Sequence, residues 1–370
     1  MAQQHLDPTD PTAGAVTGDA LAAYLRAQAT EFLRALRLHR ETGGSSNGAE
    51  GSVDATRALR RSARRISGSL HTFRPLLDAA WSEEIRPELA WLSGTLALEH
   101  AYGARLERLL LALHRLSGSV VLPAQGDVAD VAVGSRAAGA APVPPPAAPG
   151  TAGPPTHPPT TERGNLTVGA AKAGALLERQ LTLARTRAHS TALTALGSSR
   201  FHAVADKVAV LASEVPLTPT ALTTDLNPLA AAAEDRLTDA VTALPLVTAG
   251  HPYNAEALIH GLSPDPSPHP QDAPWHQVRL LLRLHRYTRE VLYGGNTPAD
   301  IRLLTAGQAL NRHRDASEAA GAAAQAARTP RIAPATAYAL GVLHADQRHE
   351  VEAARFAFQQ CWQKQAVSTS

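Results

Sequence analysis

The sequence has little of several residue types, and each shortage argues against a class of protein. A single cysteine, Cys361, among 370 residues rules out an internal disulfide bond and a cysteine-rich zinc site. Aromatic residues make up 4% of the chain, and only five residues are isoleucine. Because strands favour aromatic and β-branched residues, this shortage argues against a β-sandwich, a barrel or a parallel sheet. The apolar residues, 44% of the chain, are mostly alanine and leucine, which favour helices.

The chain also lacks long apolar runs and a strong net charge. No stretch of 18 uncharged apolar residues occurs, so we expect no membrane-spanning helix. Residues 1–18 include Asp7 and Asp10 and have no apolar run, unlike a secretory signal peptide, so we expect a disordered tail and a cytoplasmic protein. The formal net charge is +2, so any strongly basic surface must be local.

Proline divides the chain into two parts. Nine of the 18 residues in 142–159 are proline, and the surrounding stretch carries few charges. Because such a composition has little apolar area to bury, we predict a disordered linker, rich in proline, alanine and glycine, over residues 117–169. We expect one helical part at 19–116 and the remaining helices, including the second basic repeat described below, at 170–366.

Apolar residues recur at helical spacing on both sides of this linker, and no alternating strand pattern of any length occurs. The sequence therefore predicts an all-α fold. Proline and glycine residues separate most of the expected helices. These helices cover residues 19–42, 54–79, 82–116, 170–196, 198–214, 226–244, 253–262, 273–293, 297–312, 314–327 and 334–365.

One of these helices carries a stripe of arginines. The stripe consists of Arg57, Arg60, Arg61, Arg64 and Arg65. On a helix these side chains fall within one arc of about 140°, and no acid interrupts them. Because five adjacent positive charges repel one another, the stripe needs counter-charge from elsewhere. Two sources are open: a bound polyanion, or acids on a neighbouring helix such as Glu83, Glu84 or Glu88.

A second helix carries a similar stripe 219 residues later. This second stripe consists of His276, Arg279, Arg283 and Arg286. Its spacing matches the first stripe, with Arg57 in the place of His276 and Ser67 in the place of Arg286. The match indicates a duplicated helical unit. Such a duplication favours two-fold pseudo-symmetry, with the two stripes facing each other across a shared groove.

Around the two stripes the sequence resembles the CHAD (conserved histidine α-helical domain) family. In the second half the resemblance rests on Trp275-His276-x-x-Arg279-x-x-x-Arg283-x-x-Arg286-Tyr287-x-x-Glu290, Leu310-Asn311-x-His313-x-Asp315 and Leu340-Gly341-Val342-Leu343-His344. In the first half it rests on Arg60, Arg64-Arg65, Phe73-Arg74-Pro75-Leu76-Leu77 and Glu88-Leu89-x-Trp91-Leu92. It covers about residues 20–115 and 170–365.

The resemblance implies two helical bundles about a pseudo-two-fold axis, and binding of inorganic polyphosphate through basic residues that line a central channel. The candidate polyphosphate-binding residues are Arg57, Arg60, Arg61, Arg64, Arg65, His276, Arg279, Arg283 and Arg286. A location at polyphosphate granules in the cytoplasm is compatible with this function. Proteins of this family often carry a triphosphate-hydrolysing domain with an E-x-E-x-K motif. That motif is missing here, so we expect no catalysis, and without a motif such as H-E-x-x-H we expect neither a metal nor a cofactor.

Three histidine and acidic side chains have a second possible role. His276 either donates to phosphate when protonated or hydrogen-bonds a buried glutamate and holds two helices together. We expect His313 and Asp315 to form an interhelix bond of the same kind rather than to contact the ligand.

The sequence departs from the family pattern in the candidate site. Arg57 stands where the family has a histidine. Three positions at which the family has basic residues hold Ser67, Leu280 and Leu284. The Arg-Asp-x-Asp stretch that the family has in its first half is absent near Ala101. The departures keep open a helical scaffold or protein-interaction module with a degenerate ligand site. Nucleic acid is an alternative polyanion that could bind to the same arginine stripe. We do not expect this partner, because the stripe has no interleaved aromatic residues for base stacking and the sequence has no nucleic-acid-binding motif.

Overall fold

The computed structural model describes residues 16–42, 49–118, 160–251, 261–262, 269–294 and 300–363. Within these ranges the regular structure is helical, apart from one isolated bridge between Leu77 and Leu217. The predicted all-α class is therefore confirmed. The first 15 residues of the predicted tail, residues 119–159 of the predicted linker and most of the predicted helix at 253–262 lie outside the described residues.

The α-helices are α1 (Gly18–Thr42), α2 (Ala49–Thr72), α3 (Ala79–Ser117), α4 (Thr160–Leu196), α5 (Ser199–Ser213), α6 (Asn227–Thr242), α7 (Leu246–Ala249), α9 (Ala273–Tyr293), α10 (Ile301–Ala327) and α11 (Pro334–Gln363). Two short 3-10 helices, η1 (Arg74–Leu76) and η2 (Pro270–Asp272), precede α3 and α9. Polar side chains begin several of the helices. For example, the Asp78 carboxylate accepts a hydrogen bond from the Trp81 backbone N–H at the start of α3, as is typical of helix N-termini.

Some helix bounds differ from the prediction. Helix α4 begins at Thr160, inside the range predicted as linker. Helix α2 ends at Thr72 rather than at residue 79, because Pro75 lacks a backbone N–H and lies in η1. The predicted break at residue 313 was wrong: α10 is continuous, since no proline removes a helical hydrogen bond there.

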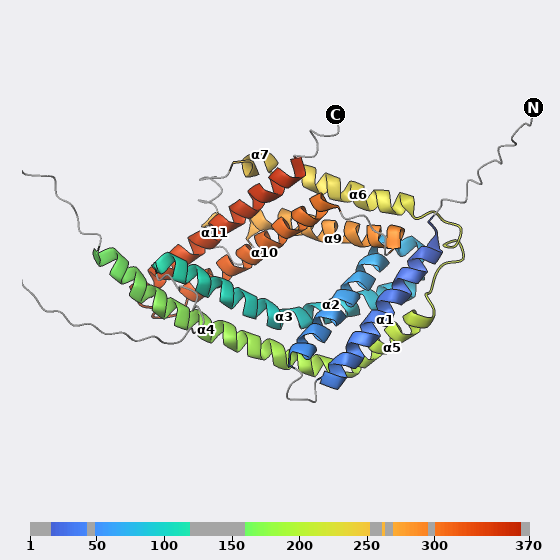
Figure 1. Cartoon of the computed structure of the whole chain (residues 1–370), viewed down its shortest axis with the longest axis horizontal. Helices are drawn as coiled ribbons and strands as arrows, with labels where there is room; N and C mark the ends of the chain where they lie inside the picture. Colours follow the sequence, from blue (N-terminus) through green and yellow to red (C-terminus); the bar gives the residue numbers. More distant parts are fainter. Residues whose placement is uncertain are drawn as a thin grey trace, which may run out of the picture.

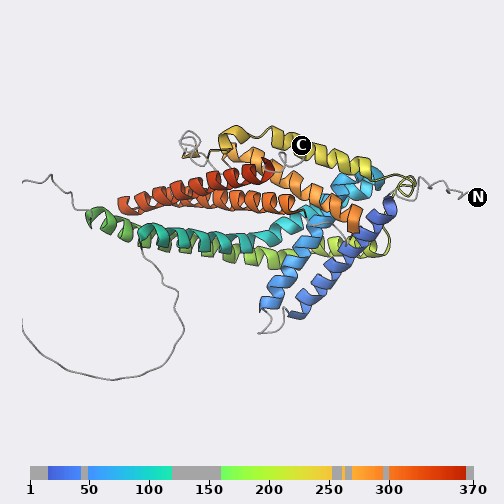
Figure 2. The same cartoon turned by 45° about the horizontal axis from the view of Figure 1, so that its top comes forward.

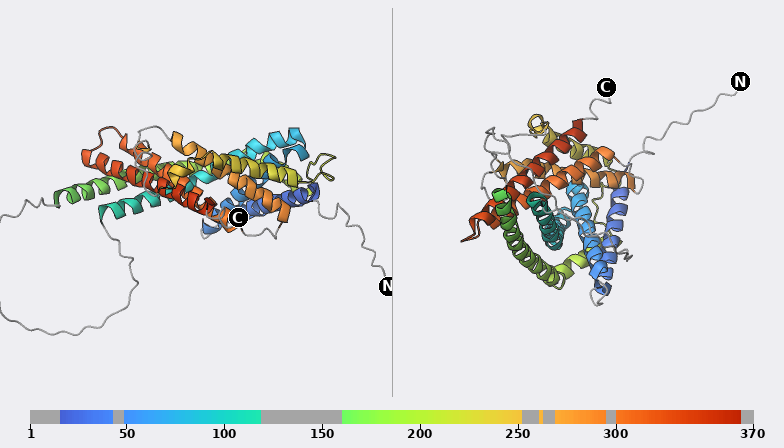
Figure 3. Two further views of the ribbon diagram at one scale, coloured as in Figure 1. Left: turned by 90° about the horizontal axis from the view of Figure 1, so that it is seen from above. Right: turned by 60° about the vertical axis from the view of Figure 1, so that its left-hand side comes forward.

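The helices pack in pairs along an elongated body (Figure 1). Helices α1, α2 and α5 lie at one end, and the long helices α3 and α4 run side by side toward the other end. Helices α10 and α11 form a second long pair that lies over α3 and α4, as Figures 2 and 3 show from other directions. Helices α6 and α9 connect this pair with the end that holds α1 and α2.

Three apolar clusters stabilise this arrangement. The first lies among α1, α2, the start of α3 and α5, with Phe32 and Ile66 fully buried. The second joins the far halves of α3 and α4 to α10 and α11, around Leu340. The third lies among α6, α9, α10 and α11, around Trp275 and Phe358. Because α9 packs against both α2 and α10, it brings side chains from the two halves of the chain together.

Candidate functional site: an arginine cluster

Five half-buried arginines from three helices lie within electrostatic reach of one another. We call them the arginine cluster. Its members are Arg60 and Arg64 from α2, Arg279 and Arg283 from α9, and Arg314 from α10. The structure thus brings together residues of the two predicted stripes and adds one residue from a third helix.

Burial and like charge act together on the two α2 members. Burial lowers the pKa of Arg60, and the charges of Arg314 and Arg283 lower it further. Burial also lowers the pKa of Arg64 to about 10, with further lowering by Arg60 and Arg283. The α2 arginines are therefore held close to positive charges from α9 and α10, at a cost in electrostatic energy that is present while no anion is bound.

The two α9 members show the same behaviour. Burial lowers the pKa of Arg279 to about 9, and Arg314 and Arg283 contribute further lowering. Burial, followed by the charges of Arg314 and Arg286, lowers the pKa of Arg283. The Arg279 Nε–H donates to Oδ1 of Asn311 over 2.8 Å, which ties this arginine to α10.

Negative charge near the cluster is scarce. Arg314 pairs with the adjacent Asp315, with 2.9 Å between Nε and Oδ1, and its Nε lies 3.9 Å from Glu318. The other four members form no ion pair with a described residue. The cluster therefore carries a local excess of positive charge although the whole chain is nearly neutral.

Arg65 lies beside the cluster but has a carboxylate partner. Its Nε and Nη2 atoms donate to the two oxygens of Glu290 over 2.7 and 3.2 Å. The Tyr24 hydroxyl donates to the same carboxylate over 2.8 Å, and burial raises the pKa of Tyr24. This network links α1, α2 and α9, so the structure gives Arg65 a helix-joining contact that its place in the stripe does not indicate.

The remaining stripe arginines lie nearer to solvent. Arg57 is exposed and pairs with Asp54 over 3.2 Å, although its charge still lowers the pKa of Arg60. Arg61 is exposed, as is Arg286, whose charge acts on Arg283. The structure therefore places Arg57 and Arg286 at the edge of the cluster, whereas Arg61 is exposed and acts on no cluster member in a described interaction.

His276 lies between the cluster and a buried histidine. Burial lowers its pKa, the charges of Arg279 and Arg314 lower it further, and the negative charge of Asp272 opposes this shift. Its ring packs edge-on against the His313 ring, with 5.5 Å between centroids. His313 is the side chain that joins helices, through Asp272 and Arg355, whereas Asp315 pairs with its sequence neighbour.

The acids that were candidates for neutralising the first stripe have other partners. Glu83 pairs with Arg74 and Arg86, each over 3.0 Å. Glu84 contacts Lys207, and Glu88 contacts Arg200 over 2.6 Å. None of these partners belongs to the first stripe. The interpretation in which these acids neutralise the first stripe therefore has no support in the described contacts.

Of two departures from the family pattern on α9, one has a structural explanation. Leu284 packs at the contact between α2 and α9, where a Cβ built on Gly68 would lie 3.2 Å from its side chain. A charged side chain at residue 284 would be desolvated there. Leu280, by contrast, is 45% exposed, and nothing in the structure explains the loss of a basic residue at that position.

Arg314 and Asn311 are members of the site that sequence reasoning missed. Arg314 belongs to neither stripe, and the adjacent Asp315 makes it look like half of an ordinary surface ion pair. The available signal is its place beside His313, in a segment that the family resemblance includes.

No group of three or more histidine, cysteine, aspartate or glutamate side chains in the part of the chain that the structure describes is arranged to hold a metal ion. No helix among the described residues is both long and apolar enough to cross a membrane.

Comparison with known proteins identifies the family. No curated protein matches the chain. The solved structure of PptA from Streptomyces chartreusis is similar, with 67% sequence identity, coverage of 94% of this chain and 100% of that chain, and a TM-score of 0.72. The CHAD domain matches residues 23–324, which is more than half of the sequence. The resemblance of the sequence motifs and the all-helical fold agree with this match, and the chain belongs to the CHAD domain family.

Proposed function

We propose that the chain binds inorganic polyphosphate, without catalysis, through the arginine cluster. The observation that carries the proposal is the gathering of five half-buried arginines from α2, α9 and α10, four of which have no ion-pair partner among the described residues. Membership of the CHAD family and the similarity to PptA support it.

The chemistry of the cluster suits a chain of phosphates. A guanidinium group donates two parallel hydrogen bonds to phosphate oxygens, and it keeps its charge at neutral pH even where burial lowers its pKa to about 9. Polyphosphate carries about one negative charge per phosphate, so several consecutive phosphates would meet several guanidinium groups. Binding would then relieve the repulsion among the arginines, which an uncharged ligand could not do.

The non-catalytic part of the proposal rests on the sequence. The chain has no E-x-E-x-K motif of the kind carried by the triphosphate-hydrolysing domain that often accompanies this family.

A titration of the wild-type chain tests the ligand class. We expect long-chain polyphosphate to bind more tightly than pyrophosphate and more tightly than a DNA duplex of equal charge. Its affinity should fall steeply as salt rises from about 50 to about 200 mM, because bound arginines displace condensed counterions from a linear polyanion. Absence of polyphosphate binding even at low salt would refute the proposal, whereas equal binding of the duplex would favour a nucleic-acid partner.

A double variant tests the site. Replacing Arg279→Ala and Arg283→Ala together should weaken polyphosphate binding more than tenfold, because each charge-assisted hydrogen bond contributes roughly 1.5–3 kcal/mol and about 1.4 kcal/mol corresponds to tenfold. The melting temperature should stay the same or rise, since repulsion in the unliganded cluster is relieved. Calorimetric titration and a melting curve measure both effects.

The matched control is Arg179→Ala with Arg187→Ala, which removes the same charge from two exposed positions on α4. Its affinity should remain within about twofold of wild type at a fixed salt concentration. A helical scaffold without a ligand makes a different prediction: the wild-type chain has no polyphosphate binding for the cluster variant to lose.

A further inference from the structure

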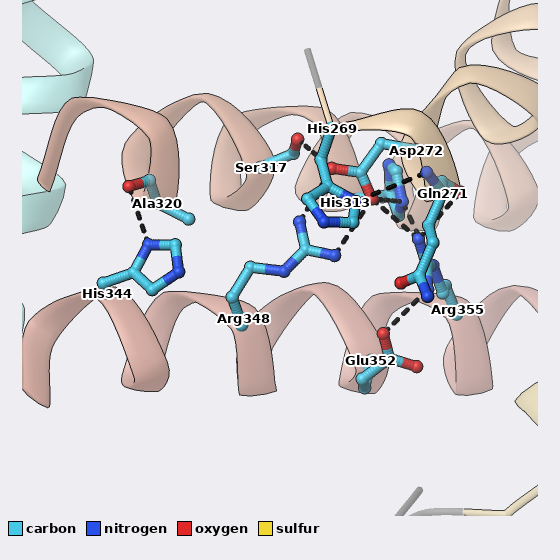
Figure 4. A network of polar contacts seen from close by, with 10 residues as sticks. All are labelled: His269, Gln271, Asp272, His313, Ser317, Ala320, His344, Arg348, Glu352 and Arg355. Atoms are coloured by element: carbon cyan, nitrogen blue, oxygen red, sulfur yellow. Dashed lines mark hydrogen bonds and ion pairs between the residues drawn. The ribbon is translucent and has the colours of Figure 1, made fainter. Parts of the chain in front are cut away.

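Asp272 is a fully buried carboxylate at the start of α9, with an exposed fraction of 0%. It occupies the N-cap position of that helix, where an aspartate ordinarily accepts a hydrogen bond from a backbone N–H of the first turn. Here the side chain makes no such bond. It points instead toward α10 and α11, as Figure 4 shows. The side chain therefore contacts neighbouring helices instead of stabilising its own.

Two side chains one turn apart on α10 contact this carboxylate. The Ser317 hydroxyl donates to Oδ2 of Asp272. The His313 ring places Nε2 3.5 Å from Oδ1 and stacks on Trp275 of α9, with 5.6 Å between ring centroids. Because these contacts come from i and i+4 of one helix, they fix both the rotation of α10 and its position along its axis.

Two arginines of α11 complete the network (Figure 4). Arg348 donates from Nη1 to Oδ2 over 2.7 Å and from Nη2 to Oδ1 over 3.2 Å. Arg355 donates to Oδ1 over 2.7 Å, to the backbone carbonyl of Gln271 over 3.0 Å and to Glu352 over 2.7 Å. Burial alone would raise the pKa of Asp272, but its contacts with His313 and Arg348 hold that pKa below its usual range.

The same stretch of α10 carries residues of the arginine cluster. Asn311, two residues before His313, accepts the hydrogen bond from Arg279. Arg314, directly after His313, lowers the pKa of Arg279 through its charge. His276, one turn after Asp272 on α9, packs between His313 and the cluster. Any rotation of α10 that released His313 and Ser317 from Asp272 would therefore displace Asn311 and Arg314 relative to α9.

We propose that Asp272 is a positioning residue of the arginine cluster, which fixes α10 against the start of α9 and so sets where Asn311 and Arg314 meet Arg279. Asp272 does not touch the ligand in this proposal. The inference rests on the proposed function where it is tested by polyphosphate binding. A second measurement, described below, tests it without any ligand.

The test compares Asp272→Asn with Leu340→Ala. Leu340 is fully buried between α11 and the helices α3, α4 and α10, so its truncation lowers stability and leaves the polar network intact. At a temperature where both variants are folded, Asp272→Asn should bind long-chain polyphosphate about tenfold more weakly than wild type. The slope of log affinity against log salt should also fall by about one charge, because one phosphate contact is lost. Leu340→Ala should keep the wild-type affinity within about twofold and the wild-type slope.

A purely structural role for Asp272 predicts a lower melting temperature with unchanged affinity and unchanged salt slope, and that result would overturn the proposal. If Asp272→Asn does not fold, Ser317→Ala decides, because it removes one hydrogen bond and leaves both arginines paired. We then expect binding to weaken about two- to fivefold. Wild-type affinity in a folded Ser317→Ala variant would overturn the proposal.

The readout without ligand is the exchange of the Arg279 Nε proton with solvent, followed by NMR. In wild type this proton is held by Asn311, so it should exchange slowly, and Asp272→Asn should accelerate its exchange. Accelerated exchange in a chain that binds no polyphosphate would refute only the proposed function. Unchanged exchange together with unchanged binding would refute only the positioning role.

Discussion

At the scale of single residues, Arg314 has the widest electrostatic influence in the site. Its charge lowers the pKa of Arg60, Arg64, Arg279 and Arg283, although burial is the larger cause in each case. Arg314 is therefore the member whose charge acts on all the others of the arginine cluster.

Arg314→Ala should therefore weaken polyphosphate binding about tenfold, since it removes at least one charge-assisted contact. Arg312→Ala is the matched control, because Arg312 is exposed on the same helix and its removal changes the net charge equally. Its affinity should stay within about twofold of wild type. Equal losses in the two variants, measured by calorimetric titration, would show that only total charge matters.

The sequence could identify most of the cluster but could not separate neighbouring arginines by role. Helical spacing predicts the stripes that contain Arg60, Arg64, Arg279 and Arg283. It gives Arg65 the same status as Arg64, because both lie on the same arc. The difference arises from Glu290, which is 225 residues away in the sequence and pairs with Arg65 only after α2 and α9 pack together. Local spacing contains no information about such a partner.

At the scale of helices, the approach of α2 to α9 depends on a glycine. A Cβ atom built on Gly68 would lie 2.6 Å from Cδ2 of Tyr287 and 3.2 Å from Leu284. The absent side chain lets the two helices come close, one turn from the point where Arg64 and Arg283 interact. The spacing of the arginines across the two halves therefore depends on this contact.

Gly68→Ala should destabilise the chain and weaken polyphosphate binding. The overpacked contact costs about 1–3 kcal/mol, which exceeds or offsets the gain of up to about 1 kcal/mol in helix propensity. Gly94→Ala provides the control, since a Cβ on this exposed glycine of α3 would have no neighbour within 4 Å. The control should be neutral or more stable. Urea denaturation measures the difference, and equal behaviour of the two variants would contradict the role of Gly68.

The bounds of one helix were predicted correctly where proline and glycine mark its ends, and those of another incorrectly where no such residue does. The bounds of α9 are those predicted, because Pro274 lies in its first turn and Gly294 follows its last residue. The continuous α10 was predicted as two helices that meet at residue 313. In the structure His313 is 1% exposed and its Nε2 atom contacts both Asp272 and Arg355. The residue at which a break was predicted therefore belongs to the buried interior of the fold.

At the scale of the whole molecule, buried histidines make stability depend on pH. Burial lowers the pKa of His313 to about 4, and it also lowers the pKa of His276 and His285. In the unfolded chain these histidines have an ordinary pKa of about 6.5, so they bind protons below that pH. In the folded chain the lowered pKa keeps them neutral to a lower pH. Because the unfolded chain then binds more protons, the free energy of unfolding should decrease as pH falls from about 6.5 toward about 4.

Urea denaturation at about pH 7.5, 6 and 5 measures this decrease, which amounts to at most about 1.4 kcal/mol per pH unit for each histidine. His313→Gln should make the pH dependence shallower by up to one proton. His202→Gln, at an exposed position, should leave it unchanged. A stability that rises on acidification would contradict the assignment of these histidines as neutral in the folded chain.

Composition was sufficient to predict the class of the fold, because a core rich in alanine and leucine favours helices. It was not sufficient to predict how the helices are arranged. Helix α9 packs against α2 from the first half and α10 from the second, and long-range contacts such as Arg65 with Glu290 and Arg348 with Asp272 connect them. These pairs become visible only in three dimensions.

The separation of the cluster members along the chain also sets an order of events during synthesis. Ribosomes add residues from the N-terminus, so Arg60 and Arg64 emerge long before Arg279 and Arg314 exist. Until Glu290 has been made, Arg65 lacks the carboxylate with which it pairs, and the ion pair of Arg57 with Asp54 is the one described ion pair of the first stripe that can form on the unfinished domain. The complete cluster can form only after α10 has left the ribosome and packed against α9. A polyanion that needs all five arginines would thus distinguish a finished molecule from a nascent or truncated one.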